Sequence, residues 1–137
     1  MATFDRHSKR DLRMRFDTDP RRAGELRARL HDWLGRAGAT PEEIFDVSVA
    51  CSEAFANAIE HPLDRADPSV DVEGVVSNGE LVLTVSDHGG WRDHRLREEG
   101  GLGLPLMRSL MGSIDVQRRP KGTTVVLRRC LRSALVA

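Results

Sequence analysis

The sequence predicts an α/β two-layer sandwich, in which helices cover one face of a mixed, largely antiparallel β-sheet. Three observations lead to this prediction. Capping residues mark the starts of two helices, the hydrophobic period changes from helical to alternating after Pro62, and two turn signals divide the later β-like runs. The predicted order of elements is β-α-α-β-β-α-β-β.

The first predicted strand and helix lie between residues 11 and 38. In DLRMRF, residues 11–16, apolar residues alternate with charged ones, which indicates a half-buried strand. Asp19 is a suitable N-cap, Pro20 suits the first helical position, and Gly38 follows the last apolar residue of the helical period. We therefore expect an amphipathic helix over residues 19–38.

A second helix begins with TPEE, where Thr40 and Glu43 have the spacing of a capping box. Pro62 ends it, because proline cannot continue a helix. One face of this helix is apolar and predicts contact with the core, through Ile44, Cys51, Phe55 and Ala58.

The C-terminal half alternates strands with one short helix. Residues 69–87 form two β-like runs around Asn78-Gly79, a strong hairpin signal. Residues 104–111 are an apolar helical segment that Gly112 closes. Residues 113–131 predict a second hairpin, which turns between Pro120 and Gly122.

Composition limits the possible functions. The 137 residues suit one domain, which we assign to residues 10–132 behind a flexible tail over residues 1–9. The net charge of +0 provides no single-sign field for nucleic acid, and no apolar run approaches a membrane span or a signal peptide. We therefore expect a cytoplasmic protein that binds neither nucleic acid directly nor a membrane. Cys51 and Cys130 lack metal-site spacing, and we interpret both as buried or half-buried hydrophobic residues.

The second helix has an unusual polar stripe. At helical spacing one face collects Asp46, Glu53, Asn57, Glu60 and His61. The chain is rich in arginine, yet no Arg or Lys occurs between Pro41 and His61. The stripe could be a solvent-exposed face, or it could lie against a cation.

Three further features are individually ambiguous. Asp87 follows an apolar strand and precedes Gly89, which fits either a ligand contact or a common turn. Gly101-Leu102-Gly103-Leu104 precedes a helix, which fits an anion-binding loop or a flexible connection. Thr123 opens the last strand, where threonine is a good strand former in any case.

Together and in this order, the features resemble the GHKL, or Bergerat-fold, ATP-binding superfamily. That superfamily includes DNA gyrase B, the Hsp90 chaperones, sensor histidine kinases and the anti-sigma-factor serine kinases. The segments EAFANAIEH and GGLGLPLMRSLM look most like the last branch, and the resemblance spans roughly residues 10–130.

The resemblance implies roles for individual residues. Glu53 matches the general base, and Asn57 matches the ligand of a magnesium ion that bridges the phosphates of ATP. Asp87 matches the carboxylate that accepts the adenine amino group, and Gly89 lets the base approach. Thr123 matches the threonine that supports the adenine contact through water.

The phosphate loop carries over as Gly101, Leu102, Gly103 and Leu104, whose amides would hold the phosphates. Two departures from the family pattern stand out. Trp91 occupies the last place of the first glycine box, where the family has glycine. The lid, residues 92–99, is very short, which favours the anti-sigma branch.

By resemblance, the chain is an ATP- and magnesium-dependent serine/threonine kinase that sequesters a sigma factor. It would phosphorylate a STAS-type anti-sigma antagonist and act as a homodimer. The alternative is a non-catalytic ATP-binding regulatory module, either on its own or as a domain excised from a larger multidomain regulator. Glu53 favours the kinase.

Overall fold

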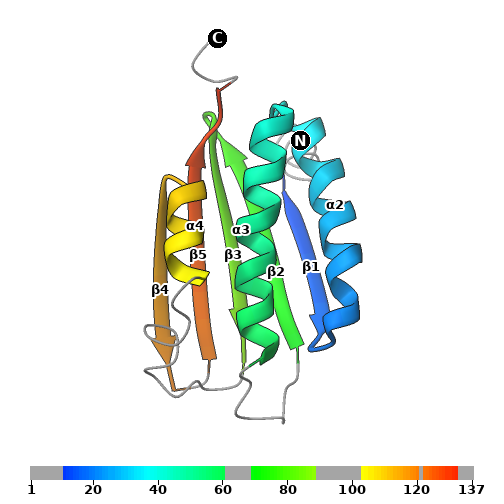
Figure 1. Ribbon diagram of the computed structural model, residues 1–137, viewed down its shortest axis with the longest axis vertical. Coiled ribbons are helices and arrows are strands. Elements are labelled where there is room, and N and C mark those ends of the chain that lie inside the picture. The colour runs from blue at the N-terminus through cyan, green and yellow to red at the C-terminus, as the bar shows by residue number, and fades with distance from the viewer. Residues whose placement is uncertain (1–10, 61–68, 89–102, 121, 133–137) are drawn as a thin grey trace, which may run out of the picture.

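The computed structural model describes residues 11–60, 69–88, 103–120 and 122–132. These residues form a single layer of strands beneath a layer of helices (Figure 1). The bounds of the elements, in chain order, are β1 Leu12–Asp17, η1 Pro20–Arg22, α2 Ala23–Arg36, α3 Pro41–Glu60, β2 Ser69–Ser77, β3 Glu80–Asp87, α4 Gly103–Leu110, β4 Ser113–Arg119 and β5 Gly122–Cys130. The predicted order of elements is therefore confirmed.

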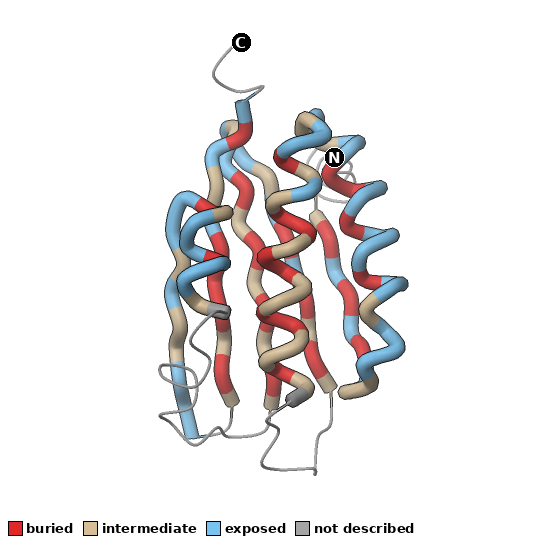
Figure 2. Tube along the Cα trace, viewed as in Figure 1, coloured by how far each residue is buried: buried red, intermediate tan, exposed pale blue. Residues whose placement is uncertain are grey.

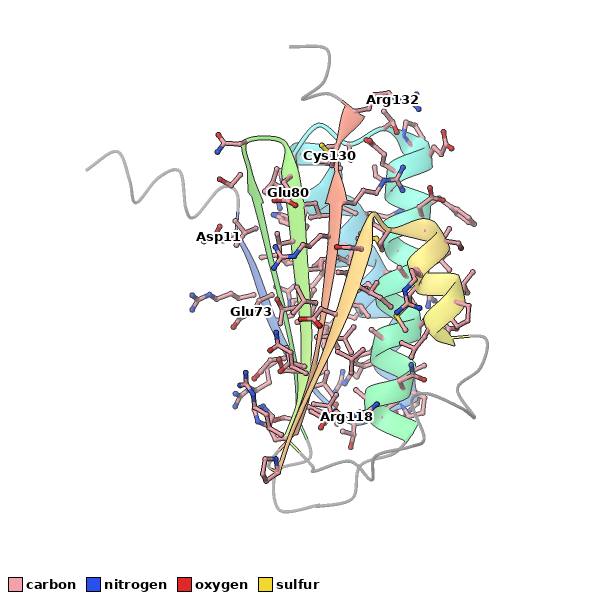
Figure 3. The ribbon with its side chains drawn as sticks, turned by 90° about the vertical axis from the view of Figure 1, so that its left-hand side faces the viewer. Asp11, Glu73, Glu80, Arg118, Cys130 and Arg132 are labelled. Atoms are coloured by element: carbon pink, nitrogen blue, oxygen red, sulfur yellow. The ribbon has the colours of Figure 1, made fainter. Side chains whose placement is uncertain are left out.

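The sheet has five strands in the order β1-β2-β3-β5-β4. Each pair of neighbours in the described residues is antiparallel. The three α-helices of the described residues cover one face of this sheet, and the edge-on view in Figure 3 shows the other face without helices. The two-layer architecture predicted from the sequence is confirmed.

Local sequence signals fix the element boundaries. The Thr40 backbone N–H donates to Glu43 Oε1 at 2.8 Å, and the Glu43 N–H donates to Thr40 Oγ1 at 3.1 Å. This is the predicted capping box. Asn78 and Gly79 both have positive φ, at 53° and 78°, as a tight hairpin turn between β2 and β3 requires.

The start of the first helix differs from the prediction. Asp19 is the N-cap, and its Oδ1 accepts the Arg21 N–H at 2.9 Å. The first turn is a 3₁₀ turn, Pro20–Arg22, and the α-helix begins only at Ala23. Short 3₁₀ turns are common at helix N-termini, where the sequence pattern does not separate them from α-helix.

The core lies between the sheet and the helices, and Figure 2 shows buried positions alternating along the strands. On α3 the predicted core face is confirmed, because Cys51, Phe55 and Ala58 are buried. Cys130 is exposed, so its interpretation as a buried or half-buried residue is wrong. It belongs to the set of alternate β5 positions that face the side of the sheet without helices.

Within the described residues, no helix combines the length and the apolar character that a membrane span needs. The predicted tail, residues 1–9, lies outside the described residues.

Candidate functional site

The predicted site residues within the described part of the chain lie on the same side of the fold, because four elements each have one end there. In Figure 1, α3 and β3 run to the lower end of the molecule, β5 starts there, and α4 begins toward it. Asp87 is the last residue of β3, and Thr123 is the second residue of β5. The fold thus brings together segments that lie far apart in the sequence.

Asp87 and Thr123 form a buried polar pair under the helices. Asp87 is 6% exposed and Thr123 is 1% exposed. The Thr123 backbone N–H donates to Asp87 Oδ1 at 3.3 Å. This bond links β5 to the end of β3, and it orients the carboxylate on the side of the sheet that carries the helices.

The approach of these two strands depends on Gly122. A Cβ atom at this position would lie 2.2 Å from the Asp87 carbonyl oxygen and 3.2 Å from the His88 Cα. Only a residue without a side chain lets the β5 backbone come this close to the Asp87 peptide. Gly122 is therefore part of the geometry that holds Asp87.

Two buried polar atoms at this end of the fold have no hydrogen-bond partner among the described residues, Asn57 Nδ2 and Thr123 Oγ1. Buried polar atoms are usually paired, so an unpaired donor or hydroxyl calls for an explanation. A polar ligand in contact with α3 and β5 would satisfy both atoms. These are also two of the residues selected from the sequence as nucleotide contacts.

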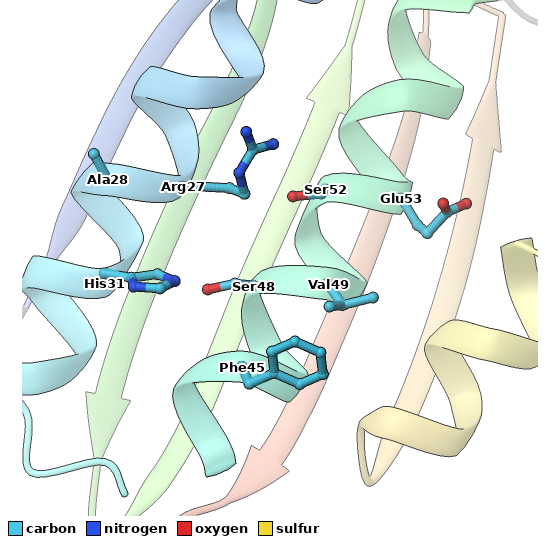
Figure 4. Close-up of a pocket in the computed structure, with 8 residues that line it drawn as sticks. All are labelled: Arg27, Ala28, His31, Phe45, Ser48, Val49, Ser52 and Glu53. Atoms are coloured by element: carbon cyan, nitrogen blue, oxygen red, sulfur yellow. The ribbon is translucent and has the colours of Figure 1, made fainter. Parts of the chain in front are cut away.

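Glu53 lies one helical turn before Asn57 on α3. Its side chain is half-buried, and Figure 4 shows it leaving α3 on the side opposite to α2, where α4 lies. No ion pair or hydrogen bond involves its carboxylate within the described residues. The group can therefore accept a proton from a molecule that approaches between α3 and α4.

Two of the four predicted phosphate-loop residues, Gly103 and Leu104, lie in the described part of the chain. Gly103 is the first residue of α4, and Leu104 is partly buried against the core. The remaining positions that the sequence analysis discusses for the stripe, the first glycine box, the lid and the phosphate loop lie outside the described residues. They are His61, Gly89, Trp91, residues 92–99, Gly101 and Leu102.

Asp46 does not belong to the site, because an arginine of the sheet binds it, so the polar stripe of α3 is not one continuous ligand-facing surface. Arg129 on β5 donates from Nη1 to Asp46 Oδ2 at 2.8 Å and to the Leu110 carbonyl oxygen at 3.0 Å. One guanidinium thus connects α3, β5 and the end of α4. Helical spacing alone cannot reveal a partner that lies 83 residues away in sequence.

Glu43 is a second long-range link that the sequence pattern missed. Besides the capping box, its Oε2 accepts the Arg132 backbone N–H, which ties the chain after β5 to the start of α3. Burial raises the pKa of Glu43, but the hydrogen bonds from Thr40 and Arg132 outweigh this effect and hold the pKa below its ordinary value.

Comparisons with known proteins agree with this geometry. Residues 16–129 match the family described as histidine kinase-like ATPase domain. The serine-protein kinase RsbW of Bacillus pumilus is 32% identical in an alignment of 139 positions, which covers 88% of this chain and 85% of the relative. The anti-sigma F factor of Clostridium kluyveri is 24% identical over 89% of this chain and 95% of the relative.

Among solved structures, the RsbU and RsbW domains of Rv1364c from Mycobacterium tuberculosis superimpose with a TM-score of 0.75 and 27% identity. The match covers 88% of this chain and 32% of that longer chain. Because the family match and the B. pumilus relative both cover most of its length, this chain belongs to the histidine kinase-like ATPase domain family.

Proposed function

We propose that this chain is an ATP-dependent protein serine/threonine kinase and anti-sigma factor that acts by partner switching. Its relatives carry the names serine-protein kinase RsbW and anti-sigma F factor, which supports both activities. The observation that carries the proposal is the set of buried polar groups at one end of the fold: the Asp87 carboxylate, Asn57 Nδ2 and Thr123 Oγ1.

Asp87 and Thr123 would bind the adenine. An ionised carboxylate accepts hydrogen bonds and donates none, so Asp87 suits the adenine amino group. The unpaired Thr123 hydroxyl would complete the contact, directly or through a water molecule. Gly89, by resemblance, would let the base approach the backbone.

Asn57 would hold the triphosphate end, together with backbone amides of residues 101–104. Its buried, unpaired amide nitrogen fits a phosphate oxygen, and its amide oxygen is a suitable ligand for Mg²⁺. No group of three His, Cys, Asp or Glu side chains gathers in the described residues, so the metal would rely on Asn57 and on the nucleotide's own oxygens. The metal would neutralise charge on the phosphates.

Glu53 would act as the general base. The hydroxyl oxygen of the acceptor Ser or Thr attacks the γ-phosphorus of ATP, and its proton passes to the Glu53 carboxylate. The bond between the γ-phosphorus and the bridging oxygen breaks, and ADP leaves. The products are a phosphorylated acceptor and ADP.

The partners follow from the same proposal. The acceptor would be a STAS-type anti-sigma antagonist, the sequestered protein a sigma factor, and the working form a cytoplasmic homodimer. A non-catalytic ATP-binding module is the competing function, and Glu53 is the residue that separates the two.

The test is transfer of labelled phosphate from ATP to a purified antagonist protein by wild type and Glu53→Ala. Alanine is the best helix former, so the helix should persist while transfer falls by about 10²–10⁴-fold. Nucleotide and sigma-factor binding should remain. Glu42→Ala is the matched control, because Glu42 is an exposed glutamate in the first turn of the same helix.

Wild-type protein that binds ATP and a partner but transfers no phosphate would refute the kinase and favour the binding module. Equal transfer by Glu53→Ala and wild type would show that another group is the base.

A further inference from the structure

A groove of about 580 Å³ lies between α2 and α3 and borders the proposed kinase site at Glu53. In Figure 4 it faces the viewer, with the sheet behind the two helices. Arg27 and His31 line it from α2, and Phe45, Ser48 and Ser52 line it from α3. An exposed aromatic ring, two serine hydroxyls and an arginine side chain indicate that this groove is a binding site.

Phe45 forms an exposed apolar rim. It is 65% exposed, more than the other large hydrophobic residues that are exposed in the described part of the chain, Val75 and Leu106. An exposed aromatic side chain beside a groove is typical of a protein interface, where aromatic residues are enriched.

The α3 wall contains two hydroxyls for which the described residues provide no hydrogen-bond partner. Ser48 is 4% exposed, and neither its Oγ nor that of Ser52 has a hydrogen-bond partner in the described residues. Figure 4 shows both hydroxyls directed toward α2, into the groove. A polar group of an occupant would satisfy them.

Arg27 is a cation on the α2 wall that has no ion-pair partner in the described part of the chain. The four other arginines of η1 and α2 each form an ion pair, namely Arg21 with Asp19, Arg22 with Asp17, Arg29 with Glu25 and Arg36 with Asp32. Arg27 forms none within the described residues. With His31 one turn away, it makes this wall suitable for a carboxylate.

We propose that this groove docks the protein that supplies the acceptor hydroxyl, which presents an apolar side chain to Phe45 and a neighbouring carboxylate to Arg27. The proposal rests on the kinase function proposed above. Glu53 belongs to the far edge of the same groove and points to the other side of α3. A protein seated in the groove can therefore extend over α3 and bring a hydroxyl to Glu53.

A protein fits these observations better than a small molecule. Phe45 is exposed on the rim instead of enclosed, and the unpaired charge of Arg27 lies on an open helix surface. Small-molecule sites are concave and enclose most of their ligand. A complementary protein surface would cover the rim and the interior together.

The first test measures the kinetics of phosphate transfer to the purified, unphosphorylated antagonist used as acceptor. Phe45→Ala and Arg27→Glu should each raise the KM for the acceptor by roughly 10- to 30-fold, the size of an interface hot spot. The kcat at saturating acceptor and the Kd for ATP should stay unchanged. Arg29→Glu is the matched control, with the same charge change on the same helix outside the groove.

Unchanged KM values in both groove variants would overturn the docking proposal while leaving the kinase intact. If wild type transfers no phosphate, the proposed function fails, and calorimetry of the same acceptor with wild type and the two variants still tests the groove. Equal acceptor binding by all three proteins, or no binding, then overturns the docking proposal.

A second test identifies the occupant. A photoreactive benzoylphenylalanine at position 45 should cross-link to an acceptor peptide that contains a carboxylate. Changing that carboxylate to lysine should restore the KM of Arg27→Glu toward the wild-type value. Cross-linking only to a second copy of this chain, or no restoration by the charge swap, would overturn the proposal.

Discussion

Replacing Gly122 with alanine should distort the proposed adenine end of the site, because the added methyl group would overlap with main-chain atoms. The new Cβ would lie 2.2 Å from the Asp87 carbonyl oxygen, and 3.2 Å from both the Asp87 carbonyl carbon and the His88 Cα. All three obstructing atoms are main-chain atoms, so no side-chain rotation can relieve the overlap. The β5 start and the end of β3 would have to separate.

The displacement of β5 from β3 that alanine requires is large compared with the tolerance of the hydrogen bond between Thr123 and Asp87. Non-bonded carbon contacts are comfortable at about 3.5 Å or more, so the two backbones must move apart by roughly 1 Å. Overpacking of this kind costs about 1–3 kcal/mol of folding free energy. The same movement would stretch the 3.3 Å hydrogen bond from the Thr123 N–H to Asp87 Oδ1 and displace the carboxylate. We expect ATP affinity to fall by roughly 10-fold or more, the factor for about 1.4 kcal/mol.

Calorimetric titration with Mg-ATP and denaturant unfolding would measure the two effects. Gly35→Ala is the matched control, because a Cβ at Gly35 in α2 meets nothing within 4 Å. It should bind ATP normally and gain up to about 1 kcal/mol of stability from better helix propensity. Wild-type ATP affinity in Gly122→Ala would refute the assignment of adenine to the Asp87 and Thr123 end.

Three other substitutions test separate parts of the account. Asn57→Ala should weaken binding of Mg-ATP far more than binding of ATP in EDTA, as measured by calorimetry; equal losses would exclude Asn57 as a metal ligand. Glu43→Ala should destabilise the fold by about 2–4 kcal/mol at neutral pH, because two backbone N–H groups lose their acceptor. Since the Glu43 pKa is lowered, its stabilising effect is present above the ordinary pKa of 4.5 and is lost as the pH falls; unfolding curves of wild type and variant should therefore converge in acid. Gly74→Ala should destabilise the core without changing ATP affinity in the folded protein, because its Cβ would lie 2.6 Å from the Trp33 ring; unchanged thermal unfolding would contradict this packing.

Much of the fold could be predicted from local sequence because its boundaries are set by local chemistry. The Thr40 and Glu43 capping box, the Asn78-Gly79 turn and the apolar face of α3 act over a few residues, and all three are present. The order of the strands in the sheet was not predicted, because pairing between β3 and β5 depends on contacts some 40 residues apart in sequence.

Residue types for the candidate site could be proposed from the sequence, but the partners of each residue could not. The period of α3 places Asp46 on the same face as Glu53 and Asn57, yet Arg129 binds Asp46. The exposure of Cys130 depends on which sheet face the helices leave uncovered, and the groove beside Phe45 depends on how α2 packs against α3. Such tertiary relations leave no periodic signal in one segment.

Calorimetric titration of the wild-type chain with ATP and with GTP, both in magnesium, would show whether Asp87 recognises adenine. If Asp87 accepts the adenine amino group, GTP presents a carbonyl oxygen to the buried carboxylate instead. An unpaired buried polar group costs about 1–3 kcal/mol, so ATP should bind roughly 5- to 150-fold more tightly than GTP. Equal affinities for ATP and GTP, or no binding of either, would contradict the account.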